Sequence, residues 1–305
     1  MARQSSKSAN IRSNIKYSSV IHDTVLSVVI PTYNRAYQLD RCLNSLFKQN
    51  YPLSKYEVIV VDDDSRDNTP KVLEKYLKKY PTLQVIRNYE NKGSDYARTV
   101  GVKRAKARVV VFTDSDCILP PNWLRKIARK FENKKVLCVQ GTQECKGKWG
   151  KFMYQREETI TFYKKRRTLD TKNLAIMKEL FLQYKFDPKI PVAGDYELGQ
   201  RLSKDIDINY DPNIIVIHVC DDFSSSIRRG KNWGKAQGYI HKKYGWGSVN
   251  PKFRYPLILL FFYYLGGLFY FSLKYRSLRG GIAFFTTTFL TAYHFKKSIA
   301  NSKLP

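Results

Sequence analysis

The chain has 305 residues, which is enough for one large domain with appendages or for two modest domains. Lysine and arginine number 54 against 26 aspartate and glutamate residues, and the net charge of +28 favours anionic partners such as phosphates, nucleic acids or anionic membrane surfaces. The 5 cysteines form neither a CxxC pair nor a zinc-binding spacing, which argues against a disulfide framework and indicates reduced, cytosolic thiols.

The N-terminal segment, residues 1–24, is polar and basic. Its opening stretch, MARQSSKSANIRSNIKYSSV, contains no apolar run, so it predicts neither a secretory signal nor a membrane anchor. We predict a disordered arm here.

Residues 25–222 alternate between strand-like and helix-like patterns. Short apolar runs of strand type recur at residues 26–30, 57–61, 83–87, 108–112 and 136–140. Apolar residues at helical spacing lie between them, at Leu39, Leu43, Leu46 and Phe47 and again at Val72, Leu73, Tyr76 and Leu77. This alternation predicts an α/β, Rossmann-like domain, with a mostly parallel sheet covered by helices on both faces. Such sheets bind ligands beyond the carboxyl ends of their strands.

Two of the predicted strands end in aspartates. The second runs into Asp62, Asp63 and Asp64, and the fourth runs into Asp114 and Asp116. Carboxylates gathered at a ligand-binding edge repel one another unless a cation joins them. Carboxylate oxygens suit Mg²⁺ or Mn²⁺, and Mg²⁺ is commonly held by one or two carboxylates together with substrate phosphates. The pattern therefore predicts a divalent cation that holds a diphosphate. Asp114 and Asp116 form a DxD pair. The alternative is that Asp114 caps the following helix or lies in a polar loop.

Several segments follow one another in a characteristic order. They are VVIPTYNRAYQLDRCLNSL, VIVVDDDSRDNT, NKGSDYARTVGVKRA, VVVFTDSDCILPPNWL, DTKNLAIMKELF and VAGDYELGQRL. Over about residues 25–240 this ordered set resembles the family 2 glycosyltransferases, which are inverting enzymes with the glycosyltransferase-A fold. The chain departs from the family pattern at Asp64, where glycine is usual, at Thr99, where asparagine is usual, and at Gly194, where the family has the glutamate of an acidic ED pair.

The resemblance implies a nucleotide-binding role for residues after the first two strands. Pro31, Thr32 and Tyr33 would line the nucleotide base. Asp63, together with Asp62, would accept hydrogen bonds from the base or the ribose.

The resemblance also implies a diphosphate and metal site. Arg98 would lie near the ribose and the phosphates of the donor. Asp114 and Asp116 match the two aspartates that bind ribose and metal-diphosphate, with Asp116 as the direct metal ligand. Relatives often have a histidine at the position of His218, close to the metal or the diphosphate; the alternative is a hydrogen-bonded core histidine.

The catalytic base is assigned by the same resemblance. Inversion by direct displacement needs a carboxylate within hydrogen-bond reach of the acceptor hydroxyl. Asp195 matches the surviving aspartate of the ED pair, and the alternative is a helix N-cap worth about 1 kcal/mol. Glu197 is predicted to be either a substitute base that contacts the acceptor or a solvated helix residue.

Residues 223–255 form a basic segment with interleaved aromatics, which we interpret as juxtamembrane. Arg228, Arg229 and Trp233 are predicted contacts of the acceptor or the diphosphate, and the alternative is a solvated charged face. The QxxRW motif of processive synthases is absent from this sequence, which favours a single addition over polymerisation.

The C-terminal region is apolar. Residues 256–273 carry no charge, and a second apolar run follows at residues 281–295. We predict a membrane-associated helical hairpin over residues 256–295, with a polar tail at residues 296–305. A segment lying in the membrane interface is the alternative.

Together these features predict a metal-dependent, inverting glycosyltransferase at a membrane, with its catalytic domain on the cytoplasmic side. It would move a sugar from a nucleotide diphosphate-sugar to a lipid-linked or glycan acceptor. One alternative is a polyprenyl-phosphate sugar synthase. Others are a nucleotide-binding pseudoenzyme, suggested by Asp64 and Gly194, and a basic protein that binds nucleic acid or lipid. Because the sequence contains no nucleic-acid-binding motif, we expect no nucleic-acid partner.

Overall fold

The computed structural model of the chain describes residues 25–147, 156–190, 193–219, 223–245, 255–274 and 278–300. The arm predicted at residues 1–24 lies outside the described residues. The chain divides into two compact units. The described residues of the first, here called the sheet unit, fall within 1–144, 155–187 and 195–219, and those of the second, the helical unit, fall within 145–154, 188–194 and 220–305.

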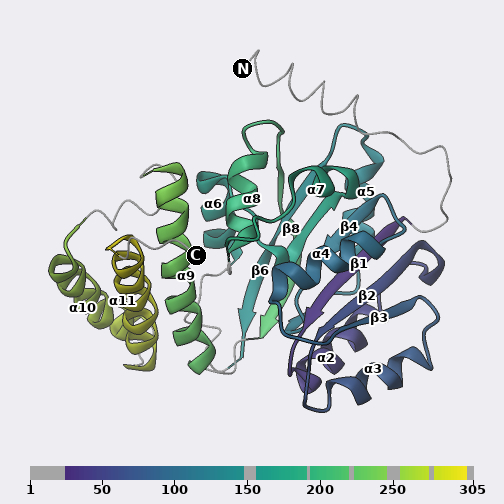
Figure 1. Cartoon of the computed structure of the whole chain (residues 1–305), viewed down its shortest axis with the longest axis horizontal. Helices are drawn as coiled ribbons and strands as arrows, with labels where there is room; N and C mark the ends of the chain where they lie inside the picture. The colour runs from purple at the N-terminus through teal and green to yellow at the C-terminus, as the bar shows by residue number, and fades with distance from the viewer. Residues whose placement is uncertain are drawn as a thin grey trace. The chain divides into compact units, whose positions relative to one another are not determined.

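The described residues form an eight-stranded sheet with the strand order β3-β2-β1-β4-β7-β6-β8-β5 (Figure 1). Its strands are β1 (Leu26–Thr32), β2 (Tyr56–Asp63), β3 (Leu83–Asn88), β4 (Val109–Phe112), β5 (Cys117–Ile118), β6 (Cys138–Lys146), β7 (Leu174–Met177) and β8 (Asn209–Val219). β3, β2, β1 and β4 are parallel neighbours. β7 is antiparallel to both β4 and β6, and β5 is antiparallel to β8.

The α/β prediction is confirmed, because all five predicted apolar runs lie on strands, namely β1, β2, β3, β4 and β6. The prediction of a mostly parallel sheet is wrong: the sheet is mixed. Apolar content shows that a strand is buried. The direction of a strand depends on the end of the sheet at which the chain re-enters it, and this is decided by the packing of the intervening segments.

The helices of the sheet unit are α2 (Ala36–Leu46), α3 (Thr69–Leu77), α4 (Ser94–Arg104), α5 (Trp123–Glu132), α6 (Arg156–Arg166), α7 (Lys178–Tyr184) and α8 (Gly194–Leu202). Their buried side chains include charged ones, such as Arg98 of α4 and Glu197 of α8. In α2 the buried residues are Leu39, Cys42, Leu43 and Leu46, at the spacing of one helix face. α4 packs on β1 and β2 through Gly101, whose missing side chain lets the helix approach Val29 closely.

The helical unit contains α9 (Phe223–Tyr244), α10 (Leu257–Lys274) and α11 (Leu278–Ala300). α11 contacts both α9 and α10. Phe261 of α10 packs edge-on against Phe285 and Phe289 of α11, with ring centroids 5.8 and 5.6 Å apart. These rings hold α10 and α11 side by side through one face of each helix.

The prediction of a membrane-crossing hairpin over residues 256–295 is not supported. Helices do occupy these positions, but none in the described part of the chain combines the length and the apolar character that a membrane span requires. Polar groups interrupt the apolar runs: α10 has two tyrosines at its middle, and α11 contains the threonines at 286–288 and two lysines near its end. Such residues lower the hydropathy of a helix over the length that a bilayer demands.

Replacing Gly101 by alanine tests the close packing of α4 on the sheet. The added Cβ would lie 2.5 Å from Cγ1 of Val29 and 3.4 Å from Cγ2 of Val61. Because overpacking a well-filled core commonly costs about 1–3 kcal/mol, we expect Gly101→Ala to lower the free energy of unfolding by that amount in urea titrations.

The matched control is Gly266→Ala, a second helical glycine, where the added Cβ would meet nothing within 4 Å. There alanine should stabilise the helix by about 0.5–1 kcal/mol. Equal stability of Gly101→Ala and the wild type would show that α4 does not approach β1 as closely as described.

Candidate active site

Residues from distant parts of the sheet unit meet at one edge of the sheet. β1, β2 and β4 are parallel, so their carboxyl ends reach the same edge. β7 runs the other way, with Leu174 opposite Phe112, so the segment that precedes it, residues 170–173, reaches this edge as well. β8 places His218 opposite Cys117, directly beside the DxD pair.

Asp62 and Asp63, the predicted base or ribose contacts, are buried and accept hydrogen bonds from the protein itself. Asp62 Oδ1 accepts from the backbone N–H of Ser65 at 3.0 Å. Asp63 accepts from the side chain of Asn88 at 2.7 Å and from the backbone N–H of Gly93 at 2.7 Å. Both carboxylates therefore anchor the loops that border the predicted nucleotide site.

Asp64 occupies a left-handed backbone conformation with φ 69°. This explains why the family pattern has glycine here, because few residues with a side chain adopt that conformation. Aspartate is among those that tolerate it. The turn is thus kept in spite of the substitution.

Pro31, Thr32 and Tyr33 close β1 and follow it at the same edge. Thr32 is buried, and its hydroxyl has no hydrogen-bond partner in the described ranges of the chain. The Tyr33 ring is exposed and offers an aromatic face on which a base could stack. Their predicted contact with the base stays a prediction.

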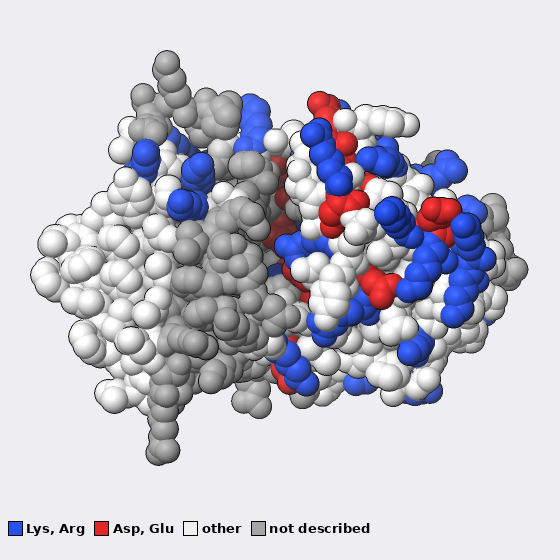
Figure 2. Space-filling view, turned by 90° about the horizontal axis from the view of Figure 1, so that it is seen from below, with Lys and Arg blue, Asp and Glu red and all other residues white. Residues whose placement is uncertain are grey.

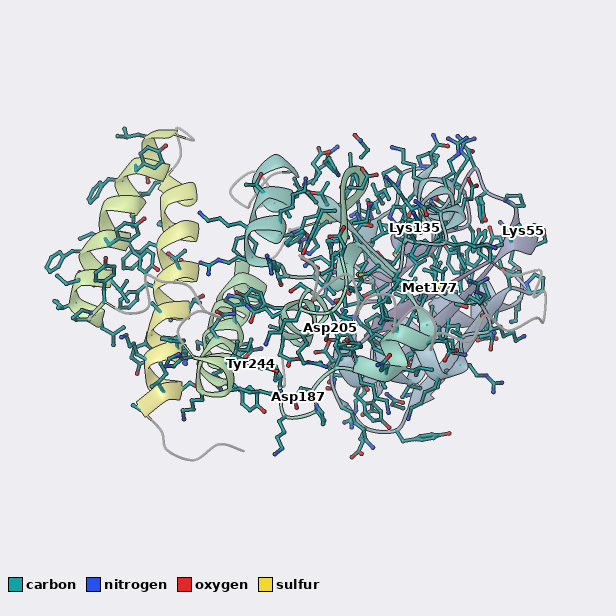
Figure 3. The ribbon with its side chains drawn as sticks, turned by 90° about the horizontal axis from the view of Figure 1, so that it is seen from above. Lys55, Lys135, Met177, Asp187, Asp205 and Tyr244 are labelled. Atoms are coloured by element: carbon teal, nitrogen blue, oxygen red, sulfur yellow. The ribbon has the colours of Figure 1, made fainter. Side chains whose placement is uncertain are left out.

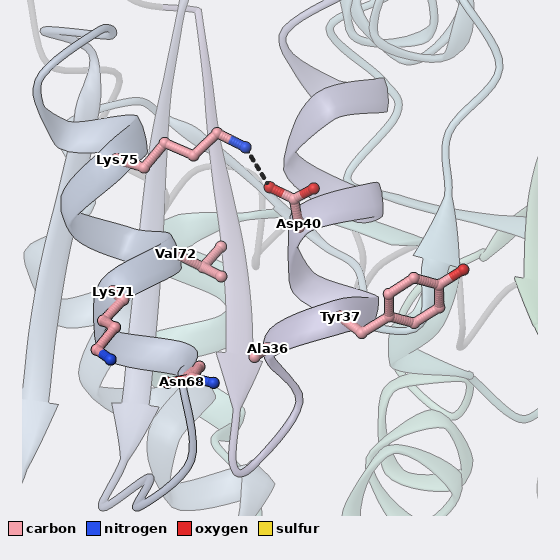
Figure 4. Close-up of a pocket in the computed structure, with 7 residues that line it drawn as sticks. All are labelled: Ala36, Tyr37, Asp40, Asn68, Lys71, Val72 and Lys75. Atoms are coloured by element: carbon pink, nitrogen blue, oxygen red, sulfur yellow. Dashed lines mark hydrogen bonds and ion pairs between the residues drawn. The ribbon is translucent and has the colours of Figure 1, made fainter.

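A hollow lies between α2 and α3 (Figure 4). It is lined by Ala36, Tyr37, Asp40, Asn68, Lys71, Val72 and Lys75. An ion pair of 2.8 Å between Lys75 and Asp40 crosses it. None of the residues that line it was predicted to bind a ligand.

Arg98 joins the DxD pair to α4. Its guanidinium is buried and donates to Asp95 at 2.9 Å and to Asp114 at 2.5 Å, and its Nε has no partner within the described part of the chain. Burial disfavours its charge, but Asp114, Asp95 and Asp195 together raise the pKa of Arg98 above its ordinary value. Asp114 is therefore fixed in place by a permanent cation, and it does not cap the next helix, whose N-cap is Asn122.

Asp116 lies between two other donors. Arg35 Nη1 donates to Asp116 Oδ2 at 2.6 Å, and His218 Nε2 lies 3.5 Å from the same oxygen. Burial opposes ionisation of Asp116, yet His218, Arg35 and Lys172 hold its pKa well below the ordinary value. The carboxylate is thus charged at neutral pH. Its other oxygen, Oδ1, is buried and has no hydrogen-bond partner among the residues that the structure describes.

The carboxylate of Asp116 and the imidazole of His218 fit a divalent cation that brings further oxygen ligands of its own. The unpartnered Oδ1 of Asp116 is a buried charged oxygen that needs a partner, and the imidazole of His218 lies beside the same carboxylate. Within the described residues no group of three or more acidic, histidine or cysteine side chains could hold a metal by itself. A cation here would need phosphate or water oxygens to complete its coordination, as Mg²⁺ commonly does.

Asp195 is held by a segment far away in sequence. Its Oδ2 accepts from the backbone N–H and the hydroxyl of Thr171 at 2.9 and 3.0 Å. Burial and then the charge of Asp170 raise the pKa of Asp195, although Thr171 and Lys172 act in the opposite direction. Lys172 Nζ in turn donates to Asp170 at 2.8 Å. Asp195 is thus an oriented carboxylate that accepts a proton more readily than an exposed one.

Glu197 is not the solvated residue that we considered in the sequence. Its side chain is fully buried, and its two carboxylate oxygens accept from Arg201 at 2.7 and 2.8 Å. A solvated position was expected because single charges on helices usually face water. The bidentate pair with Arg201 instead satisfies both oxygens inside the protein.

The three predicted residues of the basic segment lie on α9 of the helical unit. The side chains of Arg228 and Arg229 lie outside the described residues, whereas Trp233 is half-buried. Their predicted contacts with the acceptor or the diphosphate stay a prediction.

Sequence reasoning missed Arg35, Asp170 and Lys172 as site residues. The two last belong to DTKN, the start of a segment that contributes to the family resemblance, but their place beside Asp195 depends on antiparallel β7, which brings DTKN to the edge. Arg35 follows the first strand directly, and its position at a strand end was the one available signal.

Replacing Asp195 by asparagine tests the electrostatic cost of this carboxylate. A pKa raised in the folded state means that folding favours the protonated form, so stability falls as pH rises from the unfolded value, about 4, through the folded value. Asparagine carries no charge to bury. We therefore expect Asp195→Asn to raise the melting temperature at pH 7 and to lose this advantage as pH falls below about 4.

The control is Asp211→Asn. Burial acts against ionisation of Asp211, but its bond with Lys130 lowers the pKa, so its ionised form stabilises the fold above the unfolded value. Asp211→Asn should therefore melt at a lower temperature at pH 7. If Asp195→Asn also melts lower at pH 7, the environment of Asp195 favours the charged form and our interpretation is wrong.

The chain is similar in sequence to a family of known proteins. The model of the family "Glycosyl transferase family 2" matches residues 27–187. Glycosyltransferase AglE of Haloferax volcanii is 27% identical over 220 residues, which cover 70% of this chain and 72% of AglE. Dolichol-phosphate mannosyltransferase of Pyrococcus furiosus is 32% identical over 184 residues, which cover 60% of this chain and only 49% of that protein.

Solved structures show the same fold. Mannosyltransferase PcManGT from Pyrobaculum calidifontis, solved with GDP-Man and Mn²⁺, superposes with a TM-score of 0.59 at 18% identity and covers 100% of this chain and 86% of its own. TarS 1–349 of S. aureus superposes with a TM-score of 0.57 at 23% identity over 71% of this chain and 64% of its own. Because the family model matches more than half of the chain, this protein belongs to glycosyl transferase family 2 and is a glycosyltransferase with a glycosyltransferase-A-like fold.

Proposed function

We propose that this glycosyltransferase transfers a sugar, with inversion, from a nucleoside diphosphate donor to a hydroxyl group of a lipid-linked or glycan acceptor, and that Mn²⁺ or Mg²⁺ binds the diphosphate. One observation carries the proposal. The buried Arg98 donates a hydrogen bond to Asp114 of the DxD pair, and the charge of Asp195 contributes to its raised pKa. The predicted donor side and the predicted base are therefore neighbours around one guanidinium, as a direct displacement requires.

On the donor side, Asp116 and His218 would hold the cation, and Asp114 would be kept in place by Arg98. When bound, the cation neutralises the negative charge that builds up on the departing nucleoside diphosphate. The residues themselves orient the donor: the exposed ring of Tyr33 stacks on the base at the end of β1.

On the acceptor side, Asp195 would take the proton. The acceptor oxygen attacks the anomeric carbon, the bond from that carbon to the diphosphate oxygen breaks, and the hydroxyl proton moves to Asp195. Hydrogen bonds from Thr171 hold the carboxylate in one orientation. Its raised pKa suits a general base, because efficient bases have pKa values closer to the working pH.

The names of similar proteins support the donor and acceptor classes that we propose. One solved neighbour carries GDP-Man with Mn²⁺, and another carries UDP-GlcNAc. The relatives include a dolichol-phosphate mannosyltransferase and a poly(ribitol-phosphate) beta-glucosyltransferase. The first of these favours a polyprenyl-phosphate sugar synthase as the second candidate, in which a phosphate oxygen attacks and places little demand on Asp195 as a base.

Calorimetric titration of the full chain tests the diphosphate site. UDP, GDP, dTDP and CDP are each added with and without Mn²⁺. We expect one nucleotide to bind with Mn²⁺ and its affinity to fall at least about tenfold when the metal is left out or in Asp116→Ala, since one charge-assisted contact is worth about 1.5–3 kcal/mol.

Asp40→Ala is the control for this titration, because Asp40 pairs with Lys75 at the hollow between α2 and α3. It should bind nucleotide as the wild type does. The absence of nucleotide binding under every condition would refute the transferase proposal for this chain.

We further propose that the helical unit docks on the surface of an anionic membrane at the cytoplasmic side. The outer face of α10 is apolar and exposed; it includes Ile258, Leu259, Phe262, Phe269, Tyr270 and Leu273. The opposite face carries the buried Leu260 and Tyr264. Figure 3 shows side chains of α10, several with rings, that point away from α11, and Figure 2 shows an almost uncharged surface over these helices.

The charge of the region suits the same partner. Residues 223–305 contain lysines and arginines but no aspartate or glutamate. Burial and the nearby Lys235, Lys231 and Lys297 lower the pKa of His294, so cationic groups cluster there. An apolar helix face in a purely basic region matches the interface of a bilayer with anionic headgroups.

Co-sedimentation with vesicles of phosphatidylcholine and phosphatidylglycerol tests the docking surface. The wild type should pellet with the vesicles, and the double variant Phe262→Asp, Phe269→Asp should remain largely in the supernatant, because burying two carboxylates in the interface is costly. Tyr89→Asp, an exposed aromatic of the sheet unit, should pellet as the wild type does. The proposal would be overturned if the wild type stayed in the supernatant and dimerised through α10.

A further inference from the structure

Arg35 reaches the metal-binding end of the DxD pair from a different loop. It follows the end of β1, beside the predicted base-binding residues, and begins α2 as its N-cap. Its Nη1 donates to Asp116 Oδ2 at 2.6 Å. The side chain of Arg35 is 36% exposed, whereas that of Asp116 is 14% exposed. A half-exposed cation thus rests on the carboxylate that the proposed function assigns to the divalent ion.

The backbone around Arg35 is anchored. The N–H of Arg35 donates to the hydroxyl of Thr69 at 3.1 Å, and the N–H of the next residue, Ala36, donates to Asp67 at 3.0 Å. Such anchoring leaves the long side chain as the part that can move. An arginine side chain that turns about a fixed Cα samples a small volume, here the edge where the diphosphate would lie.

The second arginine of the site behaves differently. Arg98 has a side chain only 6% exposed, and it is gripped by two carboxylates, Asp95 and Asp114. Releasing it would leave two acids and a guanidinium buried without partners, which is strongly destabilising. Arg35, in contrast, holds Asp116 through an ion pair that solvent reaches, so exchanging its partner costs far less.

Two cations would share the carboxylate of Asp116. A divalent ion at Oδ1, which has no hydrogen-bond partner among the described residues, would lie next to the guanidinium bound at Oδ2, and like charges at this distance repel. A diphosphate removes the conflict, because it supplies oxygens both to the metal and to the planar guanidinium, which can bind two phosphate oxygens in bidentate geometry.

Resting on the proposed function, we infer that Arg35 couples metal binding to donor binding. Its ion pair with Asp116 opposes binding of the divalent cation alone. When the cation and the nucleoside diphosphate bind together, the ion pair between Arg35 and Asp116 breaks. Asp116 then binds the cation, and Arg35 binds a phosphate oxygen. Arg35 is thus a donor-binding residue that makes the metal site selective for the metal–diphosphate complex over the free ion.

Electron paramagnetic resonance of free Mn²⁺ tests this coupling without any need for turnover. Mn²⁺ is titrated into the full chain alone and with GDP or UDP. The wild type should bind Mn²⁺ weakly alone and much more tightly with nucleotide. In Arg35→Met, Mn²⁺ alone should bind about tenfold more tightly and the nucleotide about tenfold more weakly, the scale of one charge-assisted hydrogen bond.

Two further variants make the result specific. Arg41→Met removes another arginine of α2, which lies over the Tyr37 ring, and it should leave both affinities unchanged. Arg35→Lys keeps the charge but loses the planar fork, so it should restore the weak binding of Mn²⁺ alone and only part of the nucleotide affinity. Circular dichroism melting checks that each variant is folded.

The outcomes separate the inference from the proposed function. If the wild type binds Mn²⁺ with nucleotide but Arg35→Met matches it in both titrations, or binds Mn²⁺ alone more weakly, Arg35 is not the coupling residue and the transferase proposal stands. If the wild type binds no nucleotide with Mn²⁺ at all, both ideas are wrong.

Discussion

The neutralisation of carboxylates at one edge of a buried sheet is the interaction on which the rest of the site depends. Parallel β2 and β4 bring their acidic ends to the edge that the end of β1 also reaches, where solvent screening is weak. Arg98 balances Asp114 from inside, and Arg35 balances Asp116 from the solvent side. Each cation comes from a helix that packs on the sheet or flanks it, so the helices and the charge balance stabilise one another.

The two arginines give the two aspartates of the DxD pair different properties. Asp114 is tied to a buried cation that belongs to the fold, so it is a fixed part of the site. Asp116 is paired with a half-exposed cation and has one oxygen without a partner among the described residues, so it can bind an incoming group. Asp195 has a raised pKa because it is buried and because the charge of Asp170 acts on it. The site thus combines a carboxylate suited to a cation, Asp116, with one suited to a proton, Asp195.

Much of the fold and part of the site followed from local patterns. Short apolar runs placed the strands, because burial on both faces of a sheet needs continuous apolar residues. The DxD pair was found because charge directly after a buried strand is rare without a partner. The burial of Glu197 could not be foreseen, since its partner Arg201 is visible in the sequence but the packing that hides the pair is not. The apolar C-terminal runs suggested membrane spans, yet their helices carry too many polar groups.

The sequence by itself determined which segments are buried strands, which carry helical faces, and that the chain is strongly basic with acids at strand ends, because these depend on periodicity and composition. Only the tertiary structure decided that β7 runs antiparallel, and with it that Asp170 and Lys172 lie beside Asp195. It also decided which arginine faces which aspartate. Such pairings join residues far apart in the chain, and their distances are set by how helices and strands pack, which no local pattern records.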